Sequence, residues 1–328
     1  MNTKQKLEEL LEKSGGNYIS GNQIAKDLGL TRAAVWKCIR QLEDDGYDIE
    51  SSTRLGYRIG QLSDPVTELS VKKHLGSLSE KIALEVISET TSTNKVMKER
   101  ASELPEWYIL IAAYQSQGRG RIGRSFYSPR GTGVYLSVLL RPTLPAEQSI
   151  RITTAAAVAA CLAIEDCTDE KPQIKWVNDV FVSGKKTCGI LTEASLDMES
   201  GGLDWAVMGI GFNIYEPDGG FPENIAQIAG AIAKEPAKEL RSRIAAAFIK
   251  HFYDICSDLG SASFAEEYKK RSFVIGCRIN VLRGGSSRPA KALDIDDECR
   301  LIVEYDDGSR EALSSGEVSV RKIEQNQK

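Results

Sequence analysis

Apolar positions recur at helical spacing along the first sixty residues, and glycine and hydroxyl residues interrupt them. Leucines three and four residues apart predict a helix over residues 3–13. Ser20 and Thr31 stand where N-caps would begin two more helices, and Gly29 stands where a glycine would end the first of these. Two short alternating runs within residues 47–59 then predict a β-hairpin. This order of elements is typical of a winged helix-turn-helix.

Beyond a linker predicted at Asp64-Pro65, the pattern mixes short apolar strands with helices. The clearest strand covers residues 133–141, where apolar side chains occupy both faces. Lysines and alanines at 229–238 predict a flexible or helical surface segment. We also predict strands at 83–88, 108–115, 174–176, 179–182, 190–195 and 206–214, and helices at 149–166, 238–260 and 264–271.

The pattern changes again after Gly276, where short strands alternate with turns rich in Gly, Ser and Asp. Strands are predicted at 278–282, 289–295, 301–305 and 318–320, which together predict a small β barrel or sandwich. We therefore expect an α+β protein with a winged helix-turn-helix at 1–62, a mixed α/β domain at 66–272 and a β domain at 273–328.

Composition narrows the classes of function. The net charge of -4 gives no signal for nucleic acid over the whole chain, so any DNA contact must be local. Seven cysteines without CxxC spacing argue against a disulfide framework, and two histidines argue against a His-ligated metal or a Ser/His/Asp triad. The N-terminus lacks an apolar signal core and no apolar run is long enough for a bilayer, so we expect a cytoplasmic protein with no membrane partner.

Residues 117–124 combine three glycines and three arginines in one loop. Glycine lets backbone N–H groups approach a ligand, and arginine supplies planar charged donors for carboxylate and phosphate. The loop is therefore a candidate anion site, with a basic surface loop or an RNA-binding arginine cluster as alternatives. Its place between two apolar strands favours a site on a folded scaffold.

Four further segments carry polar groups beside apolar strands. They are Glu-Thr-Thr-Ser-Thr-Asn at 89–94, Lys-Trp-Val-Asn-Asp at 175–179, Lys-Lys-Thr-Cys-Gly-Ile-Leu at 185–191 and Gly-Ile-Gly-Phe-Asn at 209–213. Each is more often structural than functional when it occurs alone. In this order, and with the arginine loop between them, they resemble the catalytic domain of bacterial biotin–protein ligases.

The flanking regions extend this resemblance to nearly the whole chain. The layout is similar to that of the bifunctional family whose members are both biotin ligases and biotin-operon repressors. The resemblance implies a catalytic domain of class II synthetase-like type and an SH3-like C-terminal β barrel. Two positions depart from the family pattern: Val177 stands where proline is usual, and Phe212 stands where isoleucine is common before the asparagine. Both departures affect the expected backbone shape and remove no polar group.

The resemblance also assigns roles. It implies that Ser92, Thr93, Asn94, Gln115, Arg119, Gly120, Arg121 and Lys186 bind biotin. It implies that Arg121, Arg124, Lys175 and Asn178 bind ATP, with Arg121 and Lys186 as catalytic residues. Mg²⁺ would enter with ATP, and no metal site of the protein's own is expected.

The implied reaction has two steps. Biotin carboxylate, already ionised at neutral pH, would attack the α-phosphate of ATP without a base and form biotinyl-5′-adenylate. A lysine of an acceptor, the biotin carboxyl carrier protein of acetyl-CoA carboxylase or a similar domain, would then take the biotin. Asp179 is our candidate for the base in that second step. A lipoate or octanoate ligase and a non-catalytic biotin-sensing regulator are the competing interpretations.

The N-terminal pattern implies DNA as a second partner. Candidate contact residues are Gly21, Thr31, Arg32, Ala33, Ala34, Lys37, Arg40, Arg54 and Arg58. Residues 1–62 hold nine basic and nine acidic side chains, so binding would depend on one face and on a homodimer that supplies two half-sites. We expect the adenylate to favour dimerisation and act as corepressor. The alternative is a winged helix used for protein contacts.

Overall fold

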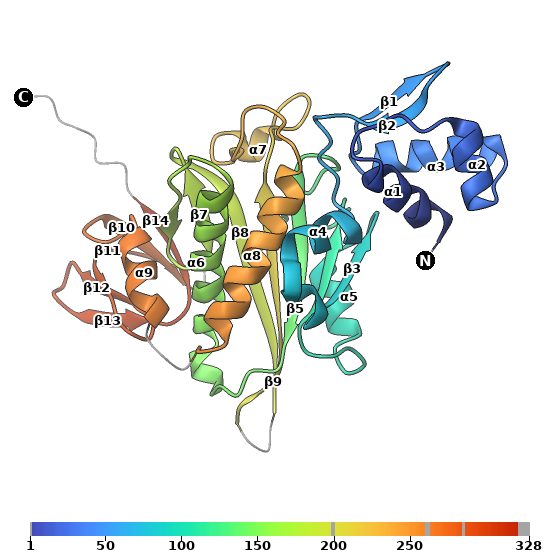
Figure 1. Cartoon of the computed structure of the whole chain (residues 1–328). Helices are drawn as coiled ribbons and strands as arrows, with labels where there is room; N and C mark the ends of the chain where they lie inside the picture. Colours follow the sequence, from blue (N-terminus) through green and yellow to red (C-terminus); the bar gives the residue numbers. More distant parts are fainter. Residues whose placement is uncertain (1, 198–200, 260–262, 284–285, 321–328) are drawn as a thin grey trace, which may run out of the picture.

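The computed structural model describes residues 2–197, 201–259, 263–283 and 286–320. At the N-terminal end, three helices and a two-stranded hairpin surround a small core of their own (Figure 1). The elements are α1 (Thr3–Lys13), α2 (Gly21–Leu28), α3 (Arg32–Asp44), β1 (Ile49–Ser52) and β2 (Gly56–Ile59). Ser20 and Thr31 cap α2 and α3 through their hydroxyls, and Gly29 ends α2 with a φ of 65°. The predicted winged helix-turn-helix is thus confirmed.

A seven-stranded sheet forms the centre of the molecule, in the order β3-β4-β5-β9-β8-β7-β6. Its strands are β3 (Ala83–Ile87), β4 (Tyr108–Ala112), β5 (Gly133–Leu140), β6 (Gln173–Lys175), β7 (Asp179–Val182), β8 (Lys185–Leu196) and β9 (Leu203–Asn213). Strands β3 and β4 are parallel, and the other neighbours are antiparallel.

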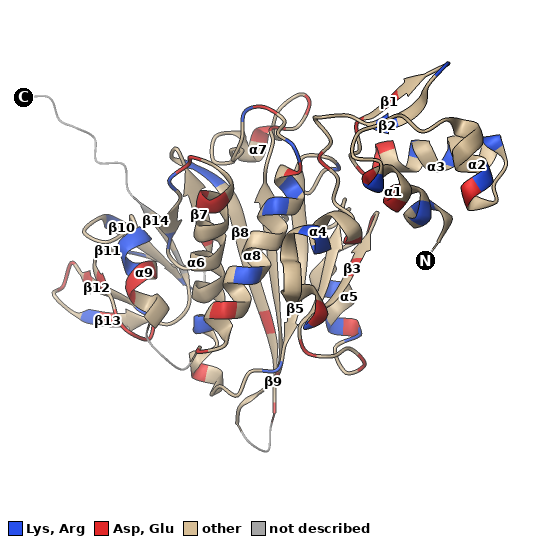
Figure 2. Cartoon of the chain, in the orientation of Figure 1, with Lys and Arg blue, Asp and Glu red and all other residues tan. Residues whose placement is uncertain are grey.

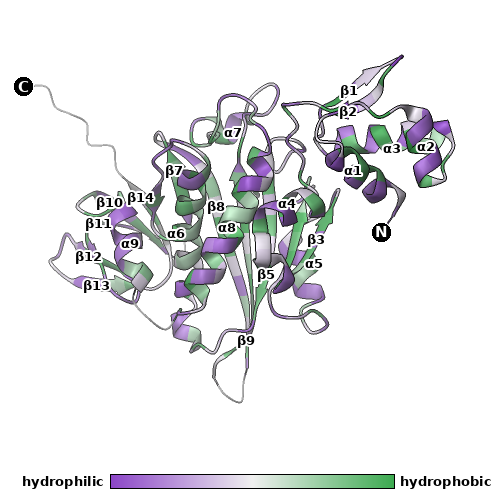
Figure 3. Ribbon diagram, viewed as in Figure 1, coloured by the Kyte–Doolittle hydropathy of each residue, from purple (hydrophilic) through white to green (hydrophobic). Residues whose placement is uncertain are grey.

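Helices cover both faces of this sheet. On one face lie α4 (Glu68–Leu75), α6 (Ile150–Cys167) and α8 (Leu240–Cys256), and on the other lies α5 (Thr93–Glu99). Strand β5 shows the consequence, because Val134 and Leu136 join the large core under α6 and α8 while Leu139 packs with Met97 of α5. Figure 3 shows hydrophobic residues concentrated along the central strands and α6. None of the helices in the described ranges has the length and apolarity to cross a membrane.

The C-terminal unit is a five-stranded antiparallel sheet in the order β13-β12-β11-β10-β14, which follows α9 (Ser263–Arg271). Its strands are β10 (Arg278–Arg283), β11 (Ser286–Ile295), β12 (Leu301–Tyr305), β13 (Arg310–Leu313) and β14 (Glu317–Val320). It contacts the central unit through Trp176, whose indole Nε1 donates to the Cys299 carbonyl at 3.1 Å. Strand β13 and helix α4 were absent from our sequence prediction.

The segment between the first two units is a buried joint. Asp64 is 6% exposed, and its carboxylate accepts from the backbone N and the Nε of Arg241 at 2.8 and 2.9 Å. Tyr215, two residues after β9, donates its hydroxyl to the same carboxylate at 2.9 Å. The backbone carbonyl of Ser63 accepts from Glu239 N at 2.9 Å. Asp64-Pro65 therefore connects the units as predicted, but it is fixed between them.

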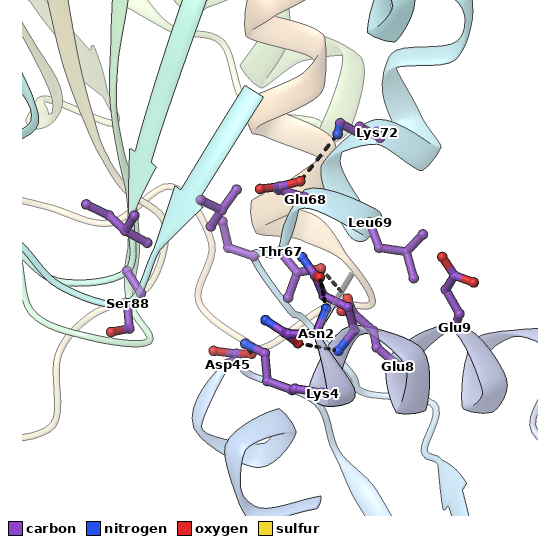
Figure 4. Close-up of a pocket in the computed structure, with 15 residues that line it drawn as sticks. Asn2, Lys4, Glu8, Glu9, Asp45, Thr67, Glu68, Leu69, Lys72 and Ser88 are labelled. Carbon is purple, nitrogen blue, oxygen red and sulfur yellow. Dashed lines mark hydrogen bonds and ion pairs between the residues drawn. The ribbon is translucent and has the colours of Figure 1, made fainter. Parts of the chain in front are cut away.

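A cavity of about 330 Å³ lies beside this joint, between α1, residues 66–72 and the end of β3 (Figure 4). At its wall the buried Glu8 carboxylate accepts from Thr67 Oγ1 at 2.5 Å and from the Tyr47 hydroxyl at 2.9 Å. Burial raises the pKa of Glu8 more than these hydrogen bonds lower it. The contact links the N-terminal helix directly to the start of the central unit.

For residues 229–238 the predicted surface position is confirmed, since Lys234, Glu235, Pro236 and Lys238 are exposed, but the predicted helix is wrong. The segment has no helix: it runs past β8, with Lys186 N donating to Ile228 O and Gly230 N donating to Lys186 O, at 2.8 and 2.9 Å. Ile232 is 3% exposed and belongs to the main core. The segment therefore supports the strand that carries Lys186.

Candidate active site

The arginine-glycine loop folds back on itself at the end of β4. Gly120 N donates to Arg124 O at 2.7 Å, and Phe126 N donates to Gly118 O at 2.8 Å. A Cβ on Gly118 would lie 2.6 Å from Ser128 Oγ, so glycine is needed there for close packing. The tip is Ile122, which is 74% exposed and has a φ of 53°. The loop is thus a narrow hairpin that carries its arginines beside the sheet.

One end of the site is built from hydroxyl and amide groups at the start of α5. The Gln115 side-chain oxygen accepts from Thr93 N at 2.9 Å, and its Nε2 donates to Ser128 Oγ at 3.0 Å. Ser137 Oγ of β5 lies 2.7 Å from Thr93 Oγ1. Ser92 and Thr93 are buried, so this end of the site presents polar groups among buried side chains.

Asn94 is held by an extensive network. Its Oδ1 accepts from Ser137 Oγ at 2.6 Å, and its Nδ2 donates to Leu191 O at 3.1 Å and to Glu193 Oε2 at 3.0 Å. Gly209 on β9 lies directly against this amide, and a Cβ there would lie 2.7 Å from Asn94 Cγ. The glycine therefore makes room for the amide, and the amide is fixed in one orientation.

Glu193 connects this network to the arginine loop. Its Oε1 lies 2.5 Å from Lys98 Nζ and 3.9 Å from Arg119 Nη1. Burial raises the pKa of Glu193, but the hydrogen bonds from Lys98 and Asn94 outweigh that effect and the pKa falls below its usual value. The carboxylate is therefore charged at neutral pH and holds cations from α5 and from the loop.

The other end of the site is cationic. Arg121 Nη1 donates to Asn178 Oδ1 at 3.1 Å, and Asn178 Nδ2 donates to Ile190 O at 2.8 Å. Arg121 Nη2 also donates to Gly316 O at 2.8 Å, which brings the C-terminal unit to the edge of the site. Lys186 Nζ lies 2.6 Å from Asp179 Oδ1. The Trp176–Val177 peptide beside this cluster is cis.

The two ends open into two adjoining cavities, of about 30 and 90 Å³. The smaller is lined by Ser92, Thr93, Asn94, Gln115, Arg119, Phe126, Leu136, Gly189, Leu191, Gly209, Ile210 and Gly211. The larger is lined by Arg119, Gly120, Arg121, Ile122, Arg124, Ser125, Phe126, Lys175, Trp176, Asn178, Asp179, Lys186, Gly189, Ile190 and Val318. Every biotin and ATP candidate from the sequence thus lines one cavity or both.

Phe126 separates the cavities and was missed by sequence reasoning. Its ring lies over β8 and β9, where a Cβ on Gly211 would lie 2.7 Å from its Cζ and one on Gly189 3.1 Å from its Cε2. Both cavities share Phe126, Arg119 and Gly189. An apolar residue two positions after the arginine loop was the available signal.

The predicted DNA-binding residues lie on the N-terminal unit, away from these cavities. Figure 2 shows basic residues on α3 and at the tip of the β1–β2 hairpin. The side chains of Arg32, Ala33, Lys37, Arg40 and Arg54 are exposed. Two candidates have structural roles: Thr31 caps α3, and Gly21 packs under Tyr57, whose Cε2 would lie 3.5 Å from an added Cβ.

Two of the predicted DNA-binding arginines are already paired with acids. Arg40 Nη1 lies 3.0 Å from Glu43 Oε2, and Arg58 Nη2 lies 2.6 Å from Glu50 Oε2. These partly exposed pairs are weak in water, and a phosphate group can compete with either carboxylate. The structure therefore keeps a cationic face at α3 and the hairpin, with less free charge than the sequence suggested.

Three family models match the chain. The biotin/lipoate A/B protein ligase family matches residues 84–213, an HTH domain matches 3–58 and the biotin protein ligase C-terminal domain matches 274–321. Bifunctional ligase/repressor BirA of Bacillus subtilis (strain 168) is 32% identical over 322 residues, covering 95% of this chain and 97% of the relative. The protein of the same name from Escherichia coli (strain K12) is 28% identical and covers 95% of this chain and 95% of its own length.

Among solved structures, the biotin protein ligase from Aquifex aeolicus in complex with biotin and ATP superposes with a TM-score of 0.61. It is 23% identical and covers 74% of this chain and 99% of its own. That likeness supports the fold of the 74% of the chain that it covers.

Proposed function

The chain belongs to the biotin/lipoate A/B protein ligase family, and we propose that it is a biotin–protein ligase that also represses transcription in response to biotin. The enzyme joins biotin to ATP, releasing pyrophosphate, and passes the biotinyl group from the adenylate to an acceptor lysine, releasing AMP. We assign residues 1–62 to DNA binding, 66–272 to catalysis and 273–328 to the C-terminal domain.

The adjacency of the two cavities, which share Arg119, Phe126 and Gly189, carries this proposal. A hydroxyl- and amide-lined pocket suits the ureido head of biotin, which both donates and accepts hydrogen bonds. A cationic pocket suits the phosphates of ATP. Arg119 borders both, so the carboxylate and the α-phosphate would meet beside it. The arrangement fits a condensation of two anions better than a hydrolysis.

In the first step, the protein acts by orienting the two substrates and by offsetting their negative charge. Ser92, Thr93, Asn94 and Gln115 would orient the biotin head, and Arg119, Gly120 and Arg121 would close over the carboxylate and phosphate. Lys186 would leave Asp179 to meet the biotin carboxylate, and Arg124, Lys175 and Asn178 would hold ATP, which brings Mg²⁺ with it. Holding the carboxylate and the phosphate in the geometry for attack supplies most of the acceleration that adenylate formation needs.

In the second step, the acceptor amine must lose a proton before it attacks the mixed anhydride. We assign Asp179 as proton acceptor, because it lies in the cationic pocket 2.6 Å from Lys186. When Lys186 turns toward the adenylate, Asp179 is released for this role. The acceptor would be a biotin carboxyl carrier protein of acetyl-CoA carboxylase or a similar biotin acceptor domain.

The repressor role adds operator DNA and a homodimer formed when the adenylate is bound. The exposed basic face of α3 and the hairpin supports DNA binding. All seven cysteines are free, which suits the reducing cytoplasm where we place the protein. DNA affinity and sedimentation measured with and without biotin plus Mg²⁺-ATP test this role. Unchanged association and unchanged affinity would contradict it.

A direct assay tests the ligase role. The protein is incubated with Mg²⁺-ATP and biotin, lipoate or octanoate, and the acyl-adenylate is detected by mass spectrometry. We expect biotinyl-adenylate alone; a lipoyl or octanoyl product would favour the alternative ligase, and no product would favour a non-catalytic regulator. Lys186→Ala should reduce adenylate formation severely. Lys185→Ala is the matched control, because the neighbouring Lys185 instead donates to Gln227 O at 2.7 Å.

A further inference from the structure

Trp36 occupies the middle of the solvent face of α3. The opposite face of this helix, with Val35, Cys38, Ile39 and Leu42, is buried in the N-terminal core. Trp36 is 56% exposed, a large fraction for the bulkiest side chain. Ala33, three residues earlier, is exposed beside it and leaves the indole open on that side. Packing inside the unit therefore gives no reason for a tryptophan here.

Positive charge surrounds the indole. Arg32, Lys37 and Arg40 are the charged residues of the helix before Glu43, and all three are exposed. The guanidinium of Arg40 lies 5.2 Å from the centre of the Trp36 ring, within cation–π range. An aromatic side chain surrounded by cations on an exposed helix is suited to bind a polyanion that also exposes apolar groups.

We propose that Trp36 reads DNA sequence by apolar contact, with its indole against thymine methyl groups in the major groove. This inference rests on the repressor function proposed above. Lys37 and Arg40 can contact phosphates, which position a protein without reading sequence. Arg32 is held by Asn22 Oδ1 at 2.6 Å. Trp36 is then the largest apolar side chain on this face, and apolar contact distinguishes thymine, because its C5 methyl group is exposed in the major groove.

The experiment uses the full chain with biotin and Mg²⁺-ATP. Duplexes that bind are selected from a random-sequence library, and each thymine in the selected site is replaced singly by deoxyuridine, which removes only the methyl group. Trp36→Ala is compared with Trp36→Phe and with Gln41→Ala, a control at another exposed position of α3. Adenylate formation by each variant shows that the central unit is folded, and far-UV circular dichroism shows that the helices of the N-terminal unit are retained.

We expect Trp36→Ala to weaken binding to the selected duplex by roughly ten- to a hundredfold and to leave binding to random duplex within about threefold. Trp36→Phe should retain most of the affinity. At one or more thymines, deoxyuridine should weaken the wild type and have no further effect on Trp36→Ala. The slope of affinity against salt should be the same for both proteins, because no phosphate contact is lost.

Several results would overturn the inference. One is an equal loss of affinity by Trp36→Ala for selected and for random duplex. Another is that deoxyuridine leaves the affinity of the wild type unchanged, and a third is that deoxyuridine still weakens binding by Trp36→Ala. Normal DNA binding by Trp36→Ala with impaired binding to a protein would show a protein-docking helix instead. If the wild type selects no duplex, the repressor function itself fails and this inference falls with it, whereas the ligase assay is unaffected.

Discussion

The replacement Gly209→Ala should damage the biotin pocket through a single carbon atom. A Cβ at this position would lie 2.7 Å from Asn94 Cγ and 3.0 Å from its Nδ2, too close for either atom. The amide cannot move freely, because Ser137, Leu191 and Glu193 hold it at 2.6 to 3.1 Å. Either the helix start of α5 shifts or part of this network breaks.

The size of the effect follows from the bonds at risk. A neutral hydrogen bond contributes about 0.5–1.5 kcal/mol and one to a charged group about 1.5–3 kcal/mol. Loss of one of each, for example those to Leu191 and Glu193, would cost roughly 2–4.5 kcal/mol. If that cost falls on the biotin complex, kcat/KM for biotin decreases about thirtyfold to a thousandfold or more, at about 1.4 kcal/mol per factor of ten.

The assay is pyrophosphate release with biotin varied at saturating ATP, and then with ATP varied. We expect the loss in the biotin titration, while KM for ATP stays near the wild-type value because no residue of β9, the strand of Gly209, lines the cationic cavity. Asn94→Ala and the double variant Asn94→Ala/Gly209→Ala complete a cycle. With no amide at position 94, the added methyl group has less to displace, so the double variant should be no worse than Asn94→Ala. Multiplicative losses would refute the steric argument.

Two further predictions concern the joint between the N-terminal and central units. Asp64→Ala leaves the buried Arg241 guanidinium without its carboxylate, so stability in urea should fall by about 3–5 kcal/mol, with faster proteolysis near residue 64; an unchanged midpoint would contradict this. Burial raises the pKa of Glu8 in the folded state above its ordinary value of 4.5. Ionisation of Glu8 therefore destabilises the fold increasingly as pH rises above that value. Glu8→Gln should therefore be more stable than wild type at pH 7, and the advantage should disappear below about pH 4; an advantage that grows on acidification would refute the assignment.

Local signals predicted much of the secondary structure. The caps at Ser20 and Thr31 and the glycine at 29 act within one turn of chain, so the sequence alone placed α2 and α3 well. Helix α4 was missed because its apolar residues are few and irregularly spaced. Strand β13, Arg-Glu-Ala-Leu, was missed because it is a polar edge strand whose pairing with β12 defines it.

The site was predicted less completely, for a physical reason. Residues recognised from motifs do line the cavities, but Glu193 acts by holding Asn94 and Lys98, which lie 99 and 95 residues earlier. Phe126 matters because two glycines on different strands leave space for its ring. Such roles depend on which distant segments meet, and no local pattern records them. The buried state of Asp64 has the same origin, since Arg241 lies 177 residues later.

The fixed joint has a consequence for the geometry of an operator. A winged helix on a loose tether could reach half-sites at many separations, and its affinity would vary little as base pairs were inserted between them. Here Asp64 is locked by Arg241 and Tyr215, so each protomer of a dimer would present α3 at a set distance and angle. Inserting about half a helical turn, roughly five base pairs, would rotate one half-site to the far side of the duplex. If the proposed dimer forms, its affinity for DNA would depend on the phase of the two half-sites as well as on their sequence.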